Sequence, residues 1–169
     1  GRFLSIGSFF QAFCLMHFPI EIIIFIWTLC LLGSGFLLFY ILDIEHQFSI
    51  SKKQKLFFAL LYALGLWLGS CTHFAETVYW ATGGVYVFDL FLGALWTYVF
   101  LCLQKIKTSN RIKIIFVLFS ILVGGLTQNL SMPLLTLVAV TVFFDYKNKQ
   151  KINLGFNVIL FFSLLTGLV

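Results

Sequence analysis

Charge is scarce in this chain, and acidic charge is scarcer than basic charge. Only 10% of the 169 residues are charged, with six Asp and Glu against eleven Lys and Arg. Soluble domains carry roughly 25% charged residues, so the composition excludes an ordinary soluble domain. The four cysteines show no Cys-x-x-Cys or Cys/His spacing. We therefore interpret them as small packing residues and predict no metal site built from Cys and His.

Apolar residues are abundant instead. The chain is 61% hydrophobic, contains 22 Phe residues and has a mean hydropathy of +1.04. A chain of this length cannot enclose that much apolar surface in water. We therefore predict a membrane protein, with membrane lipid as a partner. The net charge of +5 is expected to face anionic lipid headgroups and not nucleic acid.

The basic residues alternate with connections that contain none. Ten of the eleven lie in three clusters: Lys52, Lys53 and Lys55; Lys105, Lys107, Arg111 and Lys113; Lys147, Lys149 and Lys151. The connections near residues 17–21, 72–84 and 127–132 have neither Lys nor Arg. The positive-inside rule then places loops 43–55, 104–113 and 145–152 in the cytoplasm. On that side we interpret four residues as solvated loop charges: Asp43, Glu45, His46 and Asp145.

The apolar runs predict an all-α fold, a polytopic transmembrane helical bundle that forms one domain over residues 1–169. Clear helices are expected at 20–42, 56–74 and 85–103, with a last one beginning at 152. Residues 3–18 are short and contain Ser5, Ser8 and Gln11, so they either span the membrane or lie at its surface. The chain opens at Gly1-Arg2 without Met. We expect it to be a fragment of a longer protein.

Two shortened apolar runs, 112–126 and 134–144, predict a broken-helix hairpin. Between them lie Gly124-Gly125 and a polar stretch that ends at Pro133. Backbone exposed at membrane depth must face protein or a wet cavity, so we expect residues 127–133 to form a non-helical or sharply broken tip packed among helices. Gly33-Ser34-Gly35 inside another run predicts close helix packing.

Polar residues gather on the predicted outer side. His73, Glu76 and Trp80 are spaced to share one helix face, and Tyr79 neighbours it. A carboxylate beside aromatic rings suits sugar binding, and apolar surroundings would also let it act as a general base. The alternative is that Tyr79 and Trp80 are interfacial belt residues and Glu76 is solvated.

Three further residues on or near this side have their own alternatives. Asp89 lies one to two turns inside a span, where it either makes structural hydrogen bonds or lines the site. Glu21 follows Pro19 at a helix start, where its charge complements the helix dipole. His17 is expected at the membrane interface.

Three short patches resemble a known family. Gly1-Arg2, the segment Glu76-Thr-Val-Tyr-Trp-Ala-Thr-Gly-Gly-Val-Tyr86 and the segment Gly124-Gly-Leu-Thr-Gln-Asn129 resemble bacterial polytopic glycosyltransferases of the GT-C type. The nearest likeness is to glucosyltransferases that decorate O-antigen and to related uncharacterised membrane families. The resemblance implies sugar transfer from a polyprenyl-phosphate donor to a cell-envelope glycan or lipid acceptor, on the extracytoplasmic face of the bacterial inner membrane.

The resemblance also implies roles for individual residues. The usual catalytic acid would lie upstream of Gly1, so the catalytic residue is unknown, and residues 3–18 would form an interfacial helix. Arg2 would lie near the donor phosphate, and Glu76 with Trp80 would line the sugar or acceptor cavity. The full expected substrate-binding set is Arg2, His73, Glu76, Tyr79, Trp80, Asp89, Gln128 and Asn129.

The sequence leaves the class of function open. A transporter or flippase for a lipid-linked sugar, or a non-catalytic envelope subunit, is the alternative to a transferase. Most polar groups lie on the outer side and not near the midplane, which favours the transferase or a binding role over the transporter. The expected partners are a polyprenyl-phosphate sugar and a glycan acceptor. We predict no cofactor and leave a divalent metal open.

Overall fold

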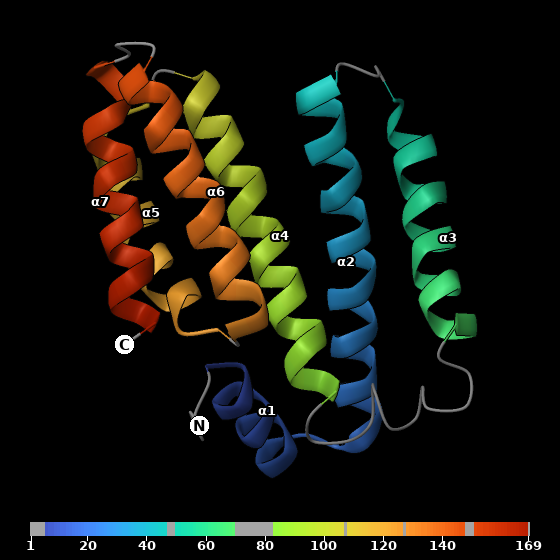
Figure 1. Cartoon of the computed structure of the whole chain (residues 1–169). Helices are drawn as coiled ribbons and strands as arrows, with labels where there is room; N and C mark the ends of the chain where they lie inside the picture. Colours follow the sequence, from blue (N-terminus) through green and yellow to red (C-terminus); the bar gives the residue numbers. More distant parts are fainter. Residues whose placement is uncertain are drawn as a thin grey trace. The chain divides into compact units, whose positions relative to one another are not determined.

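The computed structural model describes residues 6–46, 50–69, 83–106, 108–126, 128–147 and 151–168. Within these residues the chain forms seven α-helices (Figure 1): α1 (Ile6–His17), α2 (Ile20–His46), α3 (Lys52–Gly69), α4 (Gly83–Lys105), α5 (Asn110–Gly124), α6 (Gln128–Lys147) and α7 (Lys151–Leu168). The predicted all-α fold is confirmed. Among the described residues, three stretches are long and apolar enough to cross a membrane: Ile20–Ile44, Val85–Lys105 and Leu130–Lys147.

The chain divides into two compact units, residues 1–101 and residues 102–169, and each is described by itself. In the first unit α2 packs against α3 and, through aromatic side chains, against α4. Trp27 meets Phe88 with ring centroids 6.3 Å apart, and Tyr40 meets Tyr98 at 5.8 Å. The later of the two α2 residues contacts the later of the two α4 residues, so α2 and α4 run parallel. The α2–α3 connection therefore lies at the end toward which α4 runs.

The glycines of α2 allow this close packing, as the sequence predicts. A Cβ atom on Gly33 would lie 2.8 Å from Phe91, and one on Gly35 would lie 2.7 Å from Tyr62 of α3. Between them Ser34 is fully buried and donates a 2.8 Å hydrogen bond to the Leu31 carbonyl. Small residues let neighbouring helices approach where side chains would hold them apart.

The core of the first unit includes two of the cysteines. Cys14 and Cys30 are buried in one cluster with Trp27 and other apolar side chains of α1, α2 and α4. Their interpretation as packing residues is confirmed, whereas Cys71 lies outside the described residues. Glu21 stands exposed in the first turn of α2, where its charge complements the helix dipole as predicted.

The loop predicted at 43–55 is shorter than expected, and Asp43 is not a solvated loop charge. It lies in α2, half-buried, and forms an ion pair with Lys55 of α3, which is only 4% exposed. The Lys55 ammonium also lies 3.9 Å from the centre of the Tyr40 ring. Asp43 Oδ1 accepts a 3.2 Å hydrogen bond from the Ile50 amide. Glu45 and His46 are helical too, so the loop expectation is wrong for these residues as well.

A capping box starts α3 directly after this connection. The Ser51 amide donates to Gln54 Oε1 at 2.9 Å, and the Gln54 amide donates to Ser51 Oγ at 3.3 Å. These reciprocal bonds satisfy amides that a helix start leaves without partners. Together with the Asp43–Lys55 ion pair, they fix where α2 ends and α3 begins.

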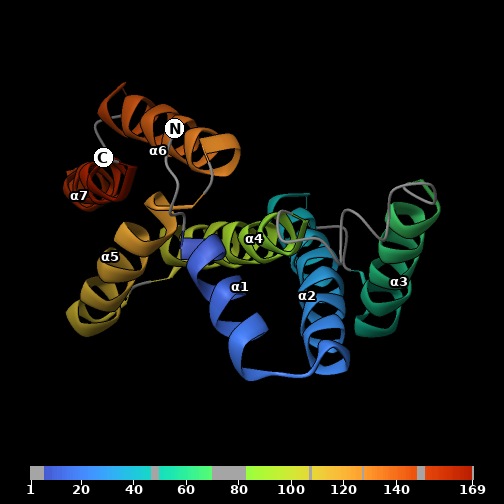
Figure 2. The same cartoon turned by 90° about the horizontal axis from the view of Figure 1, so that it is seen from below.

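In the second unit α7 packs against both α5 and α6, and the view from below shows it between them (Figure 2). The α5–α7 contact brings backbone against backbone. A Cβ atom on Gly124 would lie 2.9 Å from the Leu164 carbonyl carbon, and one on Gly167 would lie 2.9 Å from the Gly124 Cα atom. Leu160 and Leu164 are completely buried beside this contact.

The break between α5 and α6 is narrower than predicted. Residues 128–133 are helical, so the expectation of a non-helical stretch there is wrong, and the break falls between Gly124 and Gln128. The amides of Gly125 and Leu126 donate 3.1 Å hydrogen bonds to carbonyls three residues back, which tightens the end of α5. Pro133 sits in the second turn of α6. There it removes a single backbone hydrogen bond near the helix start.

Candidate functional site

Most of the predicted substrate-binding residues lie outside the described part of the chain. These are Arg2, His73, Glu76, Tyr79 and Trp80. Gln128 and Asn129 form the start of α6, but their side chains are outside the described set. Asp89 is the member of the set whose side chain is placed. The expectation that these residues share one cavity therefore stays a prediction.

Asp89 lies in α4 with no exposed surface. It follows Gly84 by five residues, which corresponds to about 7.5 Å of helix rise. Its neighbour Phe88 packs on Trp27, and Phe91 packs on Gly33. A carboxylate inside an apolar span is costly and is usually placed toward the bundle interior or a cavity. Burial agrees with both readings of Asp89, a structural hydrogen-bonding residue and a site-lining residue.

Hydroxyl side chains along the described helices bond to carbonyls of their own helix. Ser34, Thr97, Ser120 and Ser163 each donate to a carbonyl three or four residues earlier, at 2.7–2.8 Å. Such back-bonding satisfies the hydroxyl group locally. Each of these hydroxyl protons is therefore donated within its own helix.

A second polar cluster joins three helix ends in the second unit. Gln104 Nε2 donates a 2.8 Å hydrogen bond to Asn157 Oδ1, and Asn157 Nδ2 lies 3.3 Å from Gln104 Oε1. The same Asn157 Nδ2 donates a 2.7 Å hydrogen bond to Asp145 Oδ2. Asn157 is completely buried and Asp145 is 8% exposed. We call these three residues the amide–carboxylate network.

The network overturns the prediction that Asp145 is a solvated loop charge. Asp145 lies within α6, two residues before its end, and its carboxylate is held by α7. The sequence contained an indication of this, because Gln104 and Asn157 are amide side chains at the edge of apolar runs. Buried amides require partners. The sequence does not say which residues supply them.

The network also brings two predicted basic loops to one end of the second unit. It ties the end of α4 and the end of α6 to the start of α7, and Lys113 near the start of α5 lies 5.2 Å from the Phe156 ring of α7. Lys105, Lys113 and Lys147 therefore lie at the same end of this unit.

Among the side chains that the structure places, no group of three His, Cys, Asp or Glu residues could hold a metal ion. The buried carboxylates Asp89 and Asp145 belong to different units. Of these two buried carboxylates, Asp89 lies inside an apolar span and Asp145 belongs to the amide–carboxylate network.

Comparison with known proteins adds no further likeness: no protein-family model, no curated protein and no solved structure matches this chain.

Proposed function

We propose that the chain is part of a bacterial inner-membrane protein that transfers a sugar from a polyprenyl-phosphate donor to an envelope glycan or lipid acceptor on the extracytoplasmic face. The observation that supports it most is the complete burial of Asp89 in α4. The helix begins at Gly83, directly after the segment that contains Glu76, Tyr79 and Trp80. Asp89 thus supplies a buried carboxylate within two turns of the start of α4, on the helix that follows the carboxylate and rings that suit a sugar.

The proposed chemistry is substrate positioning. Aromatic rings stack on the C–H faces of a sugar, and carboxylates accept hydrogen bonds from its hydroxyl groups. Trp80 is assigned to the C–H faces of the sugar and Glu76 to its hydroxyl groups. Asp89 follows them in the sequence, inside α4. Arg2 is assigned to the donor phosphate through its positive charge. No residue of the chain is assigned as the catalytic acid or base.

The pattern of polar groups favours a transferase over a flippase. A transporter needs polar groups near the bilayer midplane that can serve a moving substrate. In the described helices, Ser34, Thr97, Ser120 and Ser163 bond to their own backbone. The amide–carboxylate network lies at the basic end of its unit. Along α4, Asp89 lies near the start and Gln104 near the end, and a substrate site at one helix end suits chemistry at one membrane face.

The experiment compares Glu76→Gln and Glu21→Gln in the full-length protein. Both changes remove one carboxylate charge from the predicted outer side, but Glu21 stands exposed at the start of α2. Radiolabelled polyprenyl-phosphate glucose is supplied to membranes that contain each variant. Label that enters the glycan fraction is measured, together with label that crosses the membrane still attached to the lipid.

We expect Glu76→Gln to lower transfer about 10²- to 10³-fold, the usual effect of losing one positioned polar group at a reacting centre. Glu21→Gln should retain transfer, and both variants should unfold at the parent temperature. Asp89→Asn should lower transfer if the carboxylate lines the site. Full transfer by Glu76→Gln would overturn the proposal. Movement of intact lipid-linked glucose without glycan labelling would replace it with a flippase.

A further inference from the structure

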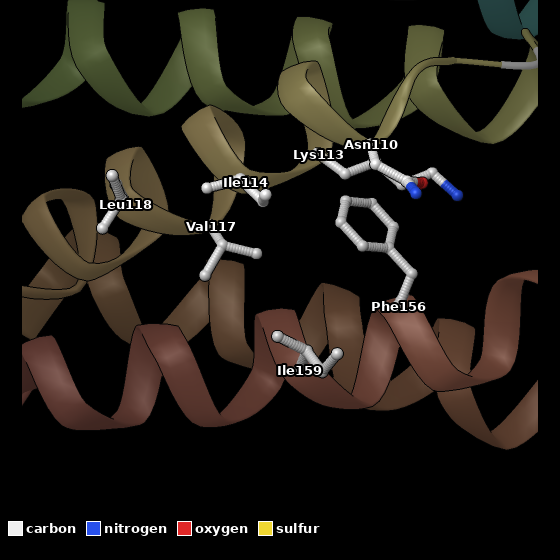
Figure 3. Close-up of a pocket in the computed structure, with 7 residues that line it drawn as sticks. All are labelled: Asn110, Lys113, Ile114, Val117, Leu118, Phe156 and Ile159. Carbon is white, nitrogen blue, oxygen red and sulfur yellow. The ribbon is translucent and has the colours of Figure 1, made fainter.

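A groove runs along the outer faces of α5 and α7 at the basic end of the second unit. It has a volume of about 540 Å³ and is lined by Asn110, Lys113, Ile114, Val117, Leu118, Phe156 and Ile159. Figure 3 shows Asn110, Lys113 and Phe156 together at one end and Leu118 at the other. The groove is thus polar and basic at one end and apolar along the rest.

The charge around the polar end is almost entirely positive. Residues 102–169 contain one acidic residue, Asp145, and seven basic residues. Asp145 is buried and bonded to Asn157, so its carboxylate is turned to the interior of the unit. Lys113 is half-buried beside the Phe156 ring, and Arg111 is exposed in the same first turn of α5. An occupant with a negative head complements this end.

The start of α5 adds to this attraction. Ser109 precedes the helix in an extended conformation, and its side chain makes no capping hydrogen bond. The first-turn amides of a helix carry partial positive charge and attract anions. These amides lie next to Asn110 and Lys113, at the basic end of the groove.

The groove continues from its polar end along apolar side chains of α5 and α7. From Asn110 to Leu118 the helix rises about 12 Å. Ile114 and Leu118 are exposed, and Ile159 faces them from α7. A molecule that fills this groove has an anionic head at the surface and a hydrocarbon chain that points into the bilayer.

We infer that the groove between α5 and α7 binds an anionic phospholipid, with its phosphate at Lys113 and the start of α5 and one acyl chain along Ile114, Val117 and Ile159. This site is separate from the proposed sugar-transfer site and does not depend on it. The lipid bridges α5 and α7 at the end opposite the backbone contact of Gly124 and Gly167.

Native mass spectrometry of the full-length protein in detergent tests the site. Phosphatidylglycerol and phosphatidylcholine with identical acyl chains are titrated separately, and glycerol phosphate is used as a free-headgroup competitor. We expect phosphatidylglycerol to bind at least about fivefold more tightly, the effect of roughly one basic contact at a membrane surface. Glycerol phosphate should not displace the lipid.

Paired variants separate this groove from general surface charge. Lys113→Gln should abolish the preference for phosphatidylglycerol, Lys113→Arg should keep it, and Lys53→Gln, an exposed lysine of α3, should leave it unchanged. Val117→Phe should weaken both lipids by filling the groove. Ile115→Phe, on an exposed face that does not line it, should weaken neither.

Several results would overturn the inference. Equal binding of the two lipids to the parent protein is one, and an equal loss in Lys53→Gln and Lys113→Gln is another. Displacement of the lipid by glycerol phosphate would show that only an anion is bound. The unfolding temperature of each variant identifies any loss that comes from misfolding, and Lys113→Arg then decides the role of the charge.

Discussion

Asn157 Nδ2 of α7 donates a 2.7 Å hydrogen bond to Asp145 Oδ2 of α6, and both residues are buried. Because Asn157 also bonds with Gln104, one amide side chain connects three helix ends. Its environment explains why an acidic residue can be buried beside a cluster of lysines.

Asn157→Leu should destabilise the protein by about 1–3 kcal/mol, since it leaves the buried Asp145 carboxylate and Gln104 amide without this partner. Denaturant unfolding in detergent measures the change. Asn153→Leu is the matched control, because Asn153 lies one turn earlier on α7 and is half-buried. An equal loss in the control would mean that the amide–carboxylate network contributes nothing of its own.

Gly124→Ala should destabilise the α5–α7 pair by about 1–3 kcal/mol or more, because the new methyl group meets the Leu164 backbone, which cannot rotate away. Gly155→Ala is the opposite case. A Cβ atom there meets nothing within 4 Å, so alanine should be neutral or should stabilise α7 by up to about 1 kcal/mol. Thermal unfolding of the two variants should shift in opposite directions or by clearly different amounts.

Lys55→Met should cost about 2 kcal/mol, because it removes the ion pair to Asp43 and the contact with Tyr40. Lys53→Met should change the free energy of unfolding by less than about 0.5 kcal/mol, since Lys53 is exposed on the same helix. If both variants unfold alike, the lysines of this cluster act only through their total charge.

Cysteines introduced at Phe18 and Lys52 should be labelled from opposite sides of the membrane. Both positions are exposed, and they flank α2, whose 25-residue apolar stretch rises about 37 Å, more than the roughly 30 Å hydrocarbon core. An impermeant maleimide added to intact cells should reach position 18, and position 52 only after lysis. Labelling of both positions in intact cells would contradict the predicted orientation.

The sequence predicted the type and order of the helices well because apolar runs long enough for a bilayer admit few other structures. It was less successful at the helix ends. Helix α2 continues through Asp43, which pairs with Lys55 of α3. Helix α6 already begins at Gln128, because the break occupies only the residues between Gly124 and Gln128. These outcomes depend on tertiary partners, which hydropathy does not contain.

The polar residues show the same division. The packing roles of Gly33, Gly35 and Cys30 followed from their small size inside apolar runs and are confirmed. The lysines near Asp145 in the sequence led to the prediction that it is solvated. In the structure it is buried and accepts a hydrogen bond from Asn157, twelve positions later. For the sugar site, Asp89 is buried as expected of an acidic residue in a span, and its relation to Glu76 stays a prediction.

The backbone contact at Gly124 and Gly167 has a consequence for biogenesis. α5 has 15 residues and begins with Arg111 and Lys113 among its first residues, so alone it is a poor substrate for insertion into the bilayer. Its partner surface on α7 is synthesised some forty residues later, after α6 and most of α7, which takes a ribosome at roughly 5–20 residues per second about 2–8 s. The backbone contact between α5 and α7 can therefore form only after the end of α7 has been synthesised.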